Sequence, residues 1–258
     1  MRRSLIVDLT LRELQASYES IAEFTSRQLE RFDRAWISRA YSHPDFTSVD
    51  IERFTGIKPF DLQSFYEREP SVTFVLREDR WWFSGRIDYW LYRVARKLRW
   101  LKPASAILSA RQNRLVRNTI RGIWEQFPGA AFTIVGLGAT GHFHGFANDR
   151  RVLKADAVSE REWCAIYSRS HVVIGFHGSN MLLPTAFAAG CVEILPEDRY
   201  GNIVQDISVR YSDRRQLFFY RFVGQYSSPH FVARKAISIV RDYRQFYASM
   251  CTNVYGRE

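Results

Sequence analysis

Four short apolar runs constrain the fold of this chain more than any other feature. They are rich in β-branched residues, and their apolar side chains do not alternate strictly with polar ones. Such runs are typical of strands buried on both faces of a parallel sheet. The runs are SVTFVLR (71–77), AFTIVGL (131–137), HVVIGF (171–176) and CVEILP (191–196).

Helical patterns separate these runs. We expect further short strands near 151–155 and over 216–223. The predicted helices span 84–101, 104–127, 159–168, part of 179–189, and 229–250. Alternating strands and helices predict an α/β fold, a Rossmann-like parallel sheet flanked by helices.

The ends of two helices carry specific signals. Ser159 is the expected N-cap of its helix, with Glu162 three residues on, and Gly190 suits the position just past a helix end.

The first 70 residues differ, because 10–40 follow a helical period and 41–70 contain several prolines without a sustained period. We therefore expect a helical lead-in over 1–70 and a Rossmann-like domain over 71–258.

The charge balance indicates an anionic partner. The chain of 258 residues has 37 Lys and Arg against 27 Asp and Glu, a net charge of +10. Phosphates, nucleotide-sugars, anionic lipids and nucleic acid all fit such a charge. The sequence has no helix-turn-helix, zinc-finger or RNP signature, so we do not expect specific nucleic-acid binding.

Cysteine usage and the start of the chain bear on location. Three cysteines without a C-x-x-C pair argue against a disulfide framework and favour a reducing compartment. The sequence shows no signal-peptide pattern and no apolar run long enough to cross a membrane. These features predict a cytoplasmic protein.

The strongest chemical motif is the turn at His177, Gly178 and Ser179, between a buried strand and a helical pattern. Gly178 lets the backbone come close to a ligand, and the N–H groups near Ser179 and Asn180 can then bind an anion. His177 can donate a hydrogen bond to a phosphate oxygen. The alternative is a tight strand-to-helix connection with a packed histidine.

A second motif, FVLREDRWW (74–82), brings Arg77 and Arg80 to the carboxyl end of a strand. Arginine forks match a diphosphate bidentately. Glu78 and Asp79 leave the alternative of a local arginine–carboxylate network.

The third motif is a G-x-G-x-x-G pattern that includes Gly136 and Gly138. By pattern it is a dinucleotide fingerprint, but no helical period follows, and Asp156 comes too early for the acidic residue. Its glycines either allow a ligand to come close or belong to a loop that is simply flexible. His142 and His144 lack companion ligands, so we expect no metal site.

Glu193 lies on the last apolar run. A carboxylate at the edge of a cleft can bind ribose hydroxyls or act as a base, and a solvent-facing or ion-paired Glu is the alternative. Asp198, Arg199 and Asn202 follow that strand and can reach a ligand, or belong to a polar turn. The sequence does not identify a catalytic base, and His177 and Glu193 are candidates for it.

Basic residues gather on the helix predicted over 84–101, together with Trp90, Tyr92 and Trp100. Its apolar residues share one face. Such a helix can lie on an anionic membrane, or can place a solvated basic face over a core face.

The run from His177 to Glu193 resembles the nucleotide-sugar-binding half of GT-B glycosyltransferases, most closely glycosyltransferase family 61. In that family a strand-His-Gly-Ala/Ser element precedes an apolar helix and a Gly-hydrophobic-Glu strand. Arg77 partly resembles the donor-binding arginine of the fucosyltransferase branch. The close likeness covers 171–196, and the order of elements extends it to about 71–210.

The resemblance implies a metal-independent, inverting transfer of a sugar from a nucleoside-diphosphate sugar to a hydroxyl of a glycan or glycolipid. It implies no cofactor, and a donor site built from the nine residues of the motifs above: Arg77, Arg80, Gly136, Gly138, His177, Gly178, Ser179, Asn180 and Glu193.

GT-B enzymes have two Rossmann-like domains, and this chain has room for one. The chain is then a truncated donor half, or a partner domain or chain supplies the acceptor half. The alternatives are a non-catalytic nucleotide- or anion-binding module and, third, an NAD-dependent oxidoreductase that uses the glycine-rich loop.

Overall fold

The computed structural model describes residues 18–31, 50–202 and 215–251. The chain divides into two compact units, 1–41 and 42–258. In the first, helix α2 (Tyr18–Leu29) is described. The remainder of the helix predicted over 10–40 lies outside the described residues.

A six-stranded sheet forms the centre of the second unit, and all of its strands are parallel. The predicted α/β class is therefore confirmed. The strands are β1 (Ser71–Arg77), β2 (Ala131–Leu137), β3 (Asn148–Val152), β4 (Val172–Phe176), β5 (Gly190–Leu195) and β6 (Tyr220–Gly224).

The strand order is β3-β2-β1-β4-β5-β6, so the direction of winding reverses between β1 and β4. Strand β1 pairs with β2 on one side and with β4 on the other. In open α/β sheets, ligands bind in the crevice beyond the carboxyl ends of the strands at such a switch point. The topology therefore points to the segments that follow Arg77 and Phe176.

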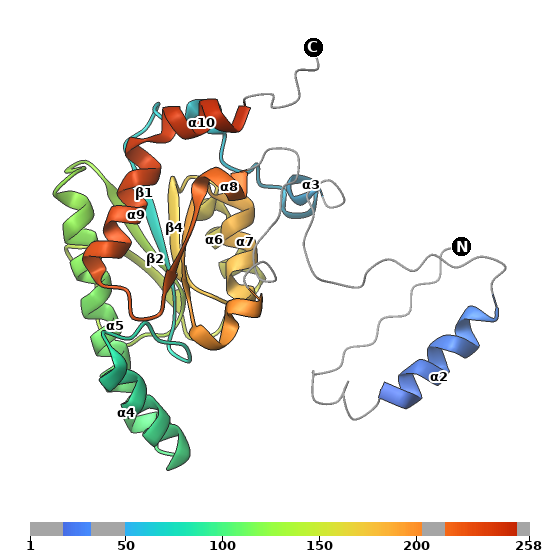
Figure 1. Ribbon diagram of the computed structural model, residues 1–258. Coiled ribbons are helices and arrows are strands. Elements are labelled where there is room, and N and C mark those ends of the chain that lie inside the picture. Colours follow the sequence, from blue (N-terminus) through green and yellow to red (C-terminus); the bar gives the residue numbers. More distant parts are fainter. Residues whose placement is uncertain (1–17, 32–49, 203–214, 252–258) are drawn as a thin grey trace. The chain divides into compact units, whose positions relative to one another are not determined.

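Helices cover both faces of the sheet (Figure 1). Helices α5 and α9 pack against each other on one face, and α6 and α7 lie together on the other. The helices of this unit are α3 (Ile51–Thr55), α4 (Arg86–Lys97), α5 (Leu101–Trp124), α6 (Ala157–Tyr167), α7 (Leu182–Phe187), α8 (Arg215–Phe219), α9 (Pro229–Arg241) and α10 (Tyr243–Cys251). Three 3-10 helices are η1 (Leu62–Ser64), η2 (Ser179–Met181) and η3 (Glu197–Asn202).

The segment before β1 belongs to the core of the second unit. Phe60, Leu62 and Phe65 are buried in the same apolar cluster as the sheet. The backbone N–H of Phe60 donates to the carbonyl of Phe187, 2.8 Å away. Residues from about 60 onward therefore pack with the sheet, although the sequence grouped all of 1–70 as a lead-in.

Several element ends differ from the sequence predictions. Asp156, not Ser159, is the N-cap of α6: its side chain accepts from the N–H of Ser159, whose own side chain accepts from the N–H of Asp156. Gly190 starts β5 instead of ending a helix, because α7 already ends at Phe187. The predicted strand over 216–223 is helical through Phe219, and Asp242 separates α9 from α10.

Helix α4 projects beyond the sheet (Figure 1) and packs through an unexpected face. Its buried residues are Asp88 and Ala95. Asp88 pairs with Arg111 of α5 and accepts from the backbone N–H of Ser84 at 3.1 Å. The predicted apolar face, by contrast, leaves Ile87 exposed.

None of the helices in the described residues is long and apolar enough to span a membrane. The three cysteines are free thiols, and Cys164 and Cys191 are buried.

Candidate functional site

The turn after β4 is held against the segment after β1. Arg80 donates from Nη1 to the carbonyl oxygen of His177 at 2.9 Å. Gly178 has a φ of 148°, and a Cβ at this position would lie 1.7 Å from Nη1 of Arg80. Only glycine leaves room for this guanidinium. The close approach seen at Gly178 is that of Arg80, and the approach of a ligand stays a prediction.

His177 and Glu193 form a buried pair. Nδ1 of His177 lies 2.5 Å from Oε1 of Glu193, and each side chain is 1% exposed. The register of β4 with β5 places Glu193 beside Gly175, two residues before the histidine. The carboxylate therefore orients the imidazole, as in catalytic pairs in which a third group holds the base. Glu193 is buried and not solvent-facing, and the paired carboxylate that the sequence left as an alternative is the arrangement present.

A cleft of about 240 Å³ opens beside this pair. Its lining includes three arginines, Arg80, Arg96 and Arg199, and two tyrosines, Tyr89 and Tyr92. The other lining residues are Asp79, Trp81, Phe83, Phe176, His177, Pro196, Asp198 and Gln225. The cleft thus combines guanidinium groups, which suit phosphates, with aromatic rings, which suit a planar base.

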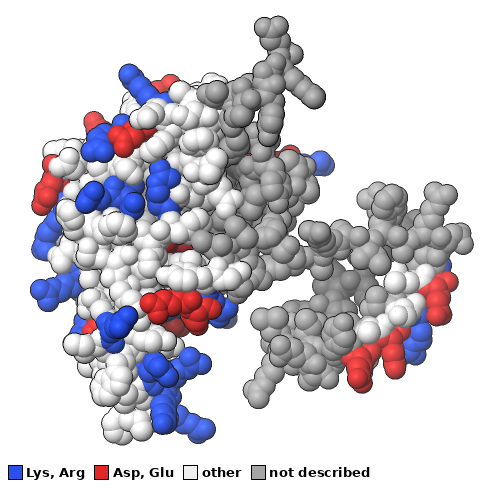
Figure 2. Space-filling model, viewed as in Figure 1, with Lys and Arg blue, Asp and Glu red and all other residues white. Residues whose placement is uncertain are grey.

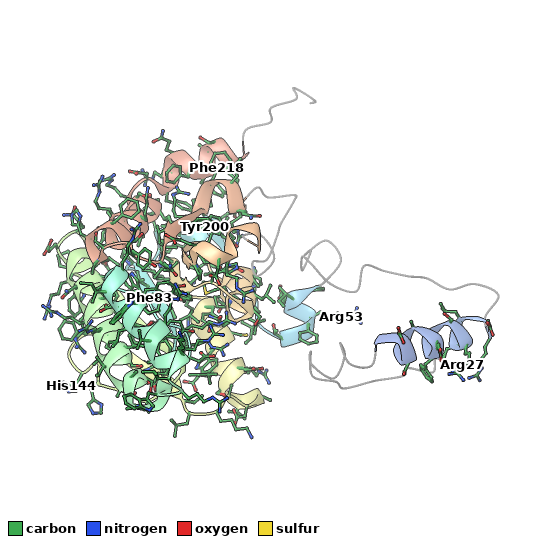
Figure 3. All side chains as sticks on the ribbon, turned by 60° about the horizontal axis from the view of Figure 1, so that its bottom comes forward. Arg27, Arg53, Phe83, His144, Tyr200 and Phe218 are labelled. Atoms are coloured by element: carbon green, nitrogen blue, oxygen red, sulfur yellow. The ribbon has the colours of Figure 1, made fainter. Side chains whose placement is uncertain are left out.

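The sequence did not predict the contribution of α4 to this cleft. Tyr89, Tyr92 and Arg96 lie on that helix and reach the cleft only because α4 packs beside the segment after β1. Phe83, labelled in Figure 3, contacts both tyrosine rings and shares a small apolar cluster with Trp81. No local sequence pattern distinguishes these aromatics from core residues. Only the tertiary packing of α4 shows that they belong to the cleft. Asp198 and Arg199 do line the cleft, whereas Asn202 is not among its lining residues.

Four of the five remaining predicted residues line a second pocket, of about 260 Å³. Arg77, Gly136, Ser179 and Asn180 contribute to it. Asn180 donates from Nδ2 to the carbonyl of Phe176 at 3.3 Å, while its buried Oδ1 has no hydrogen-bond partner within the described structure. An oxygen in that position can accept from a hydroxyl of a ligand.

Arg77 is already engaged by a carboxylate. Its Nε and Nη2 donate to the two oxygens of Asp79 at 2.7 and 2.6 Å. Burial raises the pKa of Asp79, but the hydrogen bonds and charge of Arg77 outweigh this and hold it below 3.8. The local arginine–carboxylate network, which the sequence left as the alternative to phosphate binding, is therefore present. A phosphate that binds Arg77 would have to replace the exposed Asp79.

The glycine-rich loop after β2 wraps around the side chain of Glu78. The N–H of Thr140 donates to Oε1 of Glu78 at 2.5 Å, and a Cβ on Gly138 would lie 2.4 Å from the Glu78 side chain. Arg151 lies 3.7 Å from the same carboxylate oxygen. No helix follows before β3, so the loop lacks the helix start that a dinucleotide fingerprint needs.

The two histidines of this loop lie at the surface. Both His142 and His144 are exposed, and His144 projects from the edge of the molecule (Figure 3). In the part of the chain that the structure describes, no three His, Cys, Asp or Glu residues cluster as metal ligands do.

The structure brings Arg80, His177, Gly178 and Glu193 together and places Arg77, Gly136, Ser179 and Asn180 on the adjoining side. Gly138 lines neither pocket and lies against the side chain of Glu78. Comparison of the sequence with protein-family models and with curated proteins gives no match. The interpretation of the site therefore depends on its own geometry.

Proposed function

We propose that residues 42–258 bind a nucleoside-diphosphate sugar at the switch point of the sheet and form the donor-binding half of a glycosyltransferase. The observation that carries this proposal is the cleft at the carboxyl ends of β1 and β4. There Arg80 is fixed against the His177 turn, two further arginines face the same space, and tyrosines form one wall.

The arginines of the cleft suit the diphosphate. Arg96 and Arg199 lie on segments outside the sheet, and Arg80 is braced by the backbone of His177. Positive groups that are already in place stabilise the charge that develops on a leaving diphosphate. Guanidinium groups can perform this task without a metal ion. Tyr89 and Tyr92 supply rings on which a base can stack.

His177 is the candidate for proton transfer. It lines the cleft, and Glu193 holds its Nδ1. An imidazole held in this way can accept the proton of an acceptor hydroxyl while that oxygen attacks the sugar carbon. Glu193 is then a positioning residue, because it acts through His177. Inversion at that carbon follows from the family resemblance.

A non-catalytic nucleotide-binding module is the second candidate. One observation favours it: a single parallel sheet with a cleft at its switch point is enough to bind a nucleotide, and the described part of 42–258 contains that unit. The glycine-rich loop, which is closed around Glu78, gives no comparable support to the dinucleotide alternative.

Calorimetric titration of the full chain with UDP and GDP tests the proposal. Arg80→Gln should raise the dissociation constant of the preferred nucleotide about tenfold or more, since it removes a charge-assisted phosphate contact. Arg150→Gln, at an exposed arginine of β3, is the matched control and should bind like the wild type. Equal binding by the wild type and Arg80→Gln would contradict the proposed site, as would the absence of binding.

Turnover separates the enzyme from the module. Nucleoside-diphosphate sugars should be hydrolysed slowly or transferred by the wild type, and His177→Asn should reduce turnover while nucleotide binding persists. Nucleotide binding without any turnover, tested across UDP- and GDP-sugars, would instead support the non-catalytic module.

A further inference from the structure

Helix α4 and the turn after it expose large apolar side chains. Ile87, Trp90 and Leu98 are 80%, 64% and 53% exposed, and Trp100 is 66% exposed. Ile87, Trp90 and Leu98 recur at helical spacing and therefore lie along one side of the helix. We call these four residues the apolar stripe. Large apolar side chains gathered in this way mark an interaction surface.

A row of cations borders the apolar stripe. It consists of Arg86, Arg93 and Lys97, all exposed on α4, whereas Arg96 lines the cleft. Figure 2 shows Lys and Arg side chains beside an uncharged surface where this helix projects. Between residues 84 and 107 the sequence has a single acidic residue, Asp88, and that carboxylate is buried against Arg111. The surface is therefore apolar and positive, with no exposed carboxylate from this segment.

The way α4 is attached leaves this surface available. The helix packs through the side that carries Asp88 and Ala95, and Leu91 packs against the apolar cluster of Trp81 and Phe83. Tyr89 and Tyr92 contact Phe83 on the inner side. Burying the apolar stripe is therefore not what attaches α4 to the domain.

We propose that α4 docks the protein on an anionic phospholipid surface, with the apolar stripe inserted at the level of the headgroups and the basic row on the phosphates. Tryptophan favours the membrane–water interface, and a basic helix face adds attraction to anionic lipid. A second copy of the chain is a poorer occupant, because pairing two stripes would bring two basic rows together. This proposal does not depend on the nucleotide site.

Cosedimentation of the full chain with phospholipid vesicles tests the docking surface. The protein should bind vesicles with 30% phosphatidylserine far more strongly than pure phosphatidylcholine, and added salt should weaken binding. Arg93→Gln with Lys97→Gln should weaken binding about 30-fold, from roughly 1 kcal/mol per cation. Ile87→Ser with Trp90→Ser should weaken it by about tenfold or more.

Matched variants exclude a general effect of charge or hydrophobicity. Arg161→Gln with Arg169→Gln removes two exposed cations elsewhere, and Leu153→Ser removes an apolar side chain that is 82% exposed. Both should bind vesicles like the wild type, and thermal melts should show that all variants fold. The proposal is overturned by absent or lipid-independent binding, or by stripe variants that bind normally. A dimer that Ile87→Ser with Trp90→Ser dissolves, without vesicle binding, would assign the surface to a second copy.

Discussion

His171 joins the start of β4 to the segment that leads into β1, about 100 residues earlier in the chain. Its Nδ1 accepts from the N–H of Ser71 at 3.0 Å, and its Nε2 donates to the carbonyl of Phe65 at 2.8 Å. The ring is buried at the start of β4 and meets Phe60 and Phe65 edge-on. This neutral imidazole therefore fixes the segment before β1 to the centre of the sheet.

His171 should make the stability of the protein depend on pH. Burial lowers its pKa below 6.5, although the hydrogen bond to Phe65 partly opposes this. As pH falls, the unfolded chain takes up the proton at His171 before the folded chain does. The stabilisation that His171 contributes is therefore full above about pH 6.5 and is lost as pH falls toward the lowered pKa. The melting temperature should fall between pH 7.5 and 5, and His171→Gln should reduce that dependence.

The exposed His144 provides the control, since His144→Gln should keep the wild-type dependence on pH. A His171→Gln protein whose melting temperature falls as steeply as the wild type would show that another group is responsible.

At the scale of elements, the loop between β2 and β3 is organised by a residue from another strand end. Glu78 accepts the N–H of Thr140, and Asn113 and Arg151 donate to the Thr140 carbonyl at 2.7 and 3.1 Å. The glycines at 136, 138 and 141 have positive φ values, which allow the chain to wrap around that carboxylate. The loop therefore depends on Glu78 for its conformation.

Glu78→Ala should loosen this loop without unfolding the sheet. The exchange of the Thr140 amide hydrogen should become faster, because its acceptor is lost, and stability should fall by about 1 kcal/mol. Glu125→Ala removes an exposed carboxylate at the end of α5 and should leave that exchange unchanged. Unaltered Thr140 exchange in Glu78→Ala would contradict the role assigned to Glu78.

The sequence predicted elements well where local signals agree with packing. Strands β1 and β2 match their predicted bounds, because continuous apolar runs suit a sheet covered on both faces. The predictions were wrong where packing overrides the local pattern. The exposed face of α4 and the helical turn at 215–219 are such cases.

The candidate site could be predicted only in part, because tertiary packing and not local sequence brings some of its residues together. The turn at His177 and Gly178 is a local motif, but its partner Glu193 is 16 residues away and is brought there by strand register. The aromatic wall from α4 has no local signature. Asp79 was recognisable as a competitor for Arg77, yet only the structure shows both of its oxygens engaged.

At the scale of the whole molecule, helix α4 contributes both to the cleft and to the apolar stripe. The helix contributes Tyr89, Tyr92 and Arg96 to the cleft, while its apolar stripe lies outside. Docking through α4 would hold the rim of the cleft beside a lipid surface. A donor site in that position suits a lipid-linked acceptor, which would join the proposed function to the proposed membrane surface.

Amide hydrogen exchange of the full chain, with and without UDP, GDP and NAD, tests the central claim most directly. The account predicts that UDP or GDP slows exchange in 177–181 and 78–82, at the carboxyl ends of β4 and β1, and leaves 138–141 unchanged. Protection confined to 138–141, with NAD alone, would contradict it and assign the site to the glycine-rich loop. The absence of protection by either diphosphate would equally contradict a donor site at the switch point.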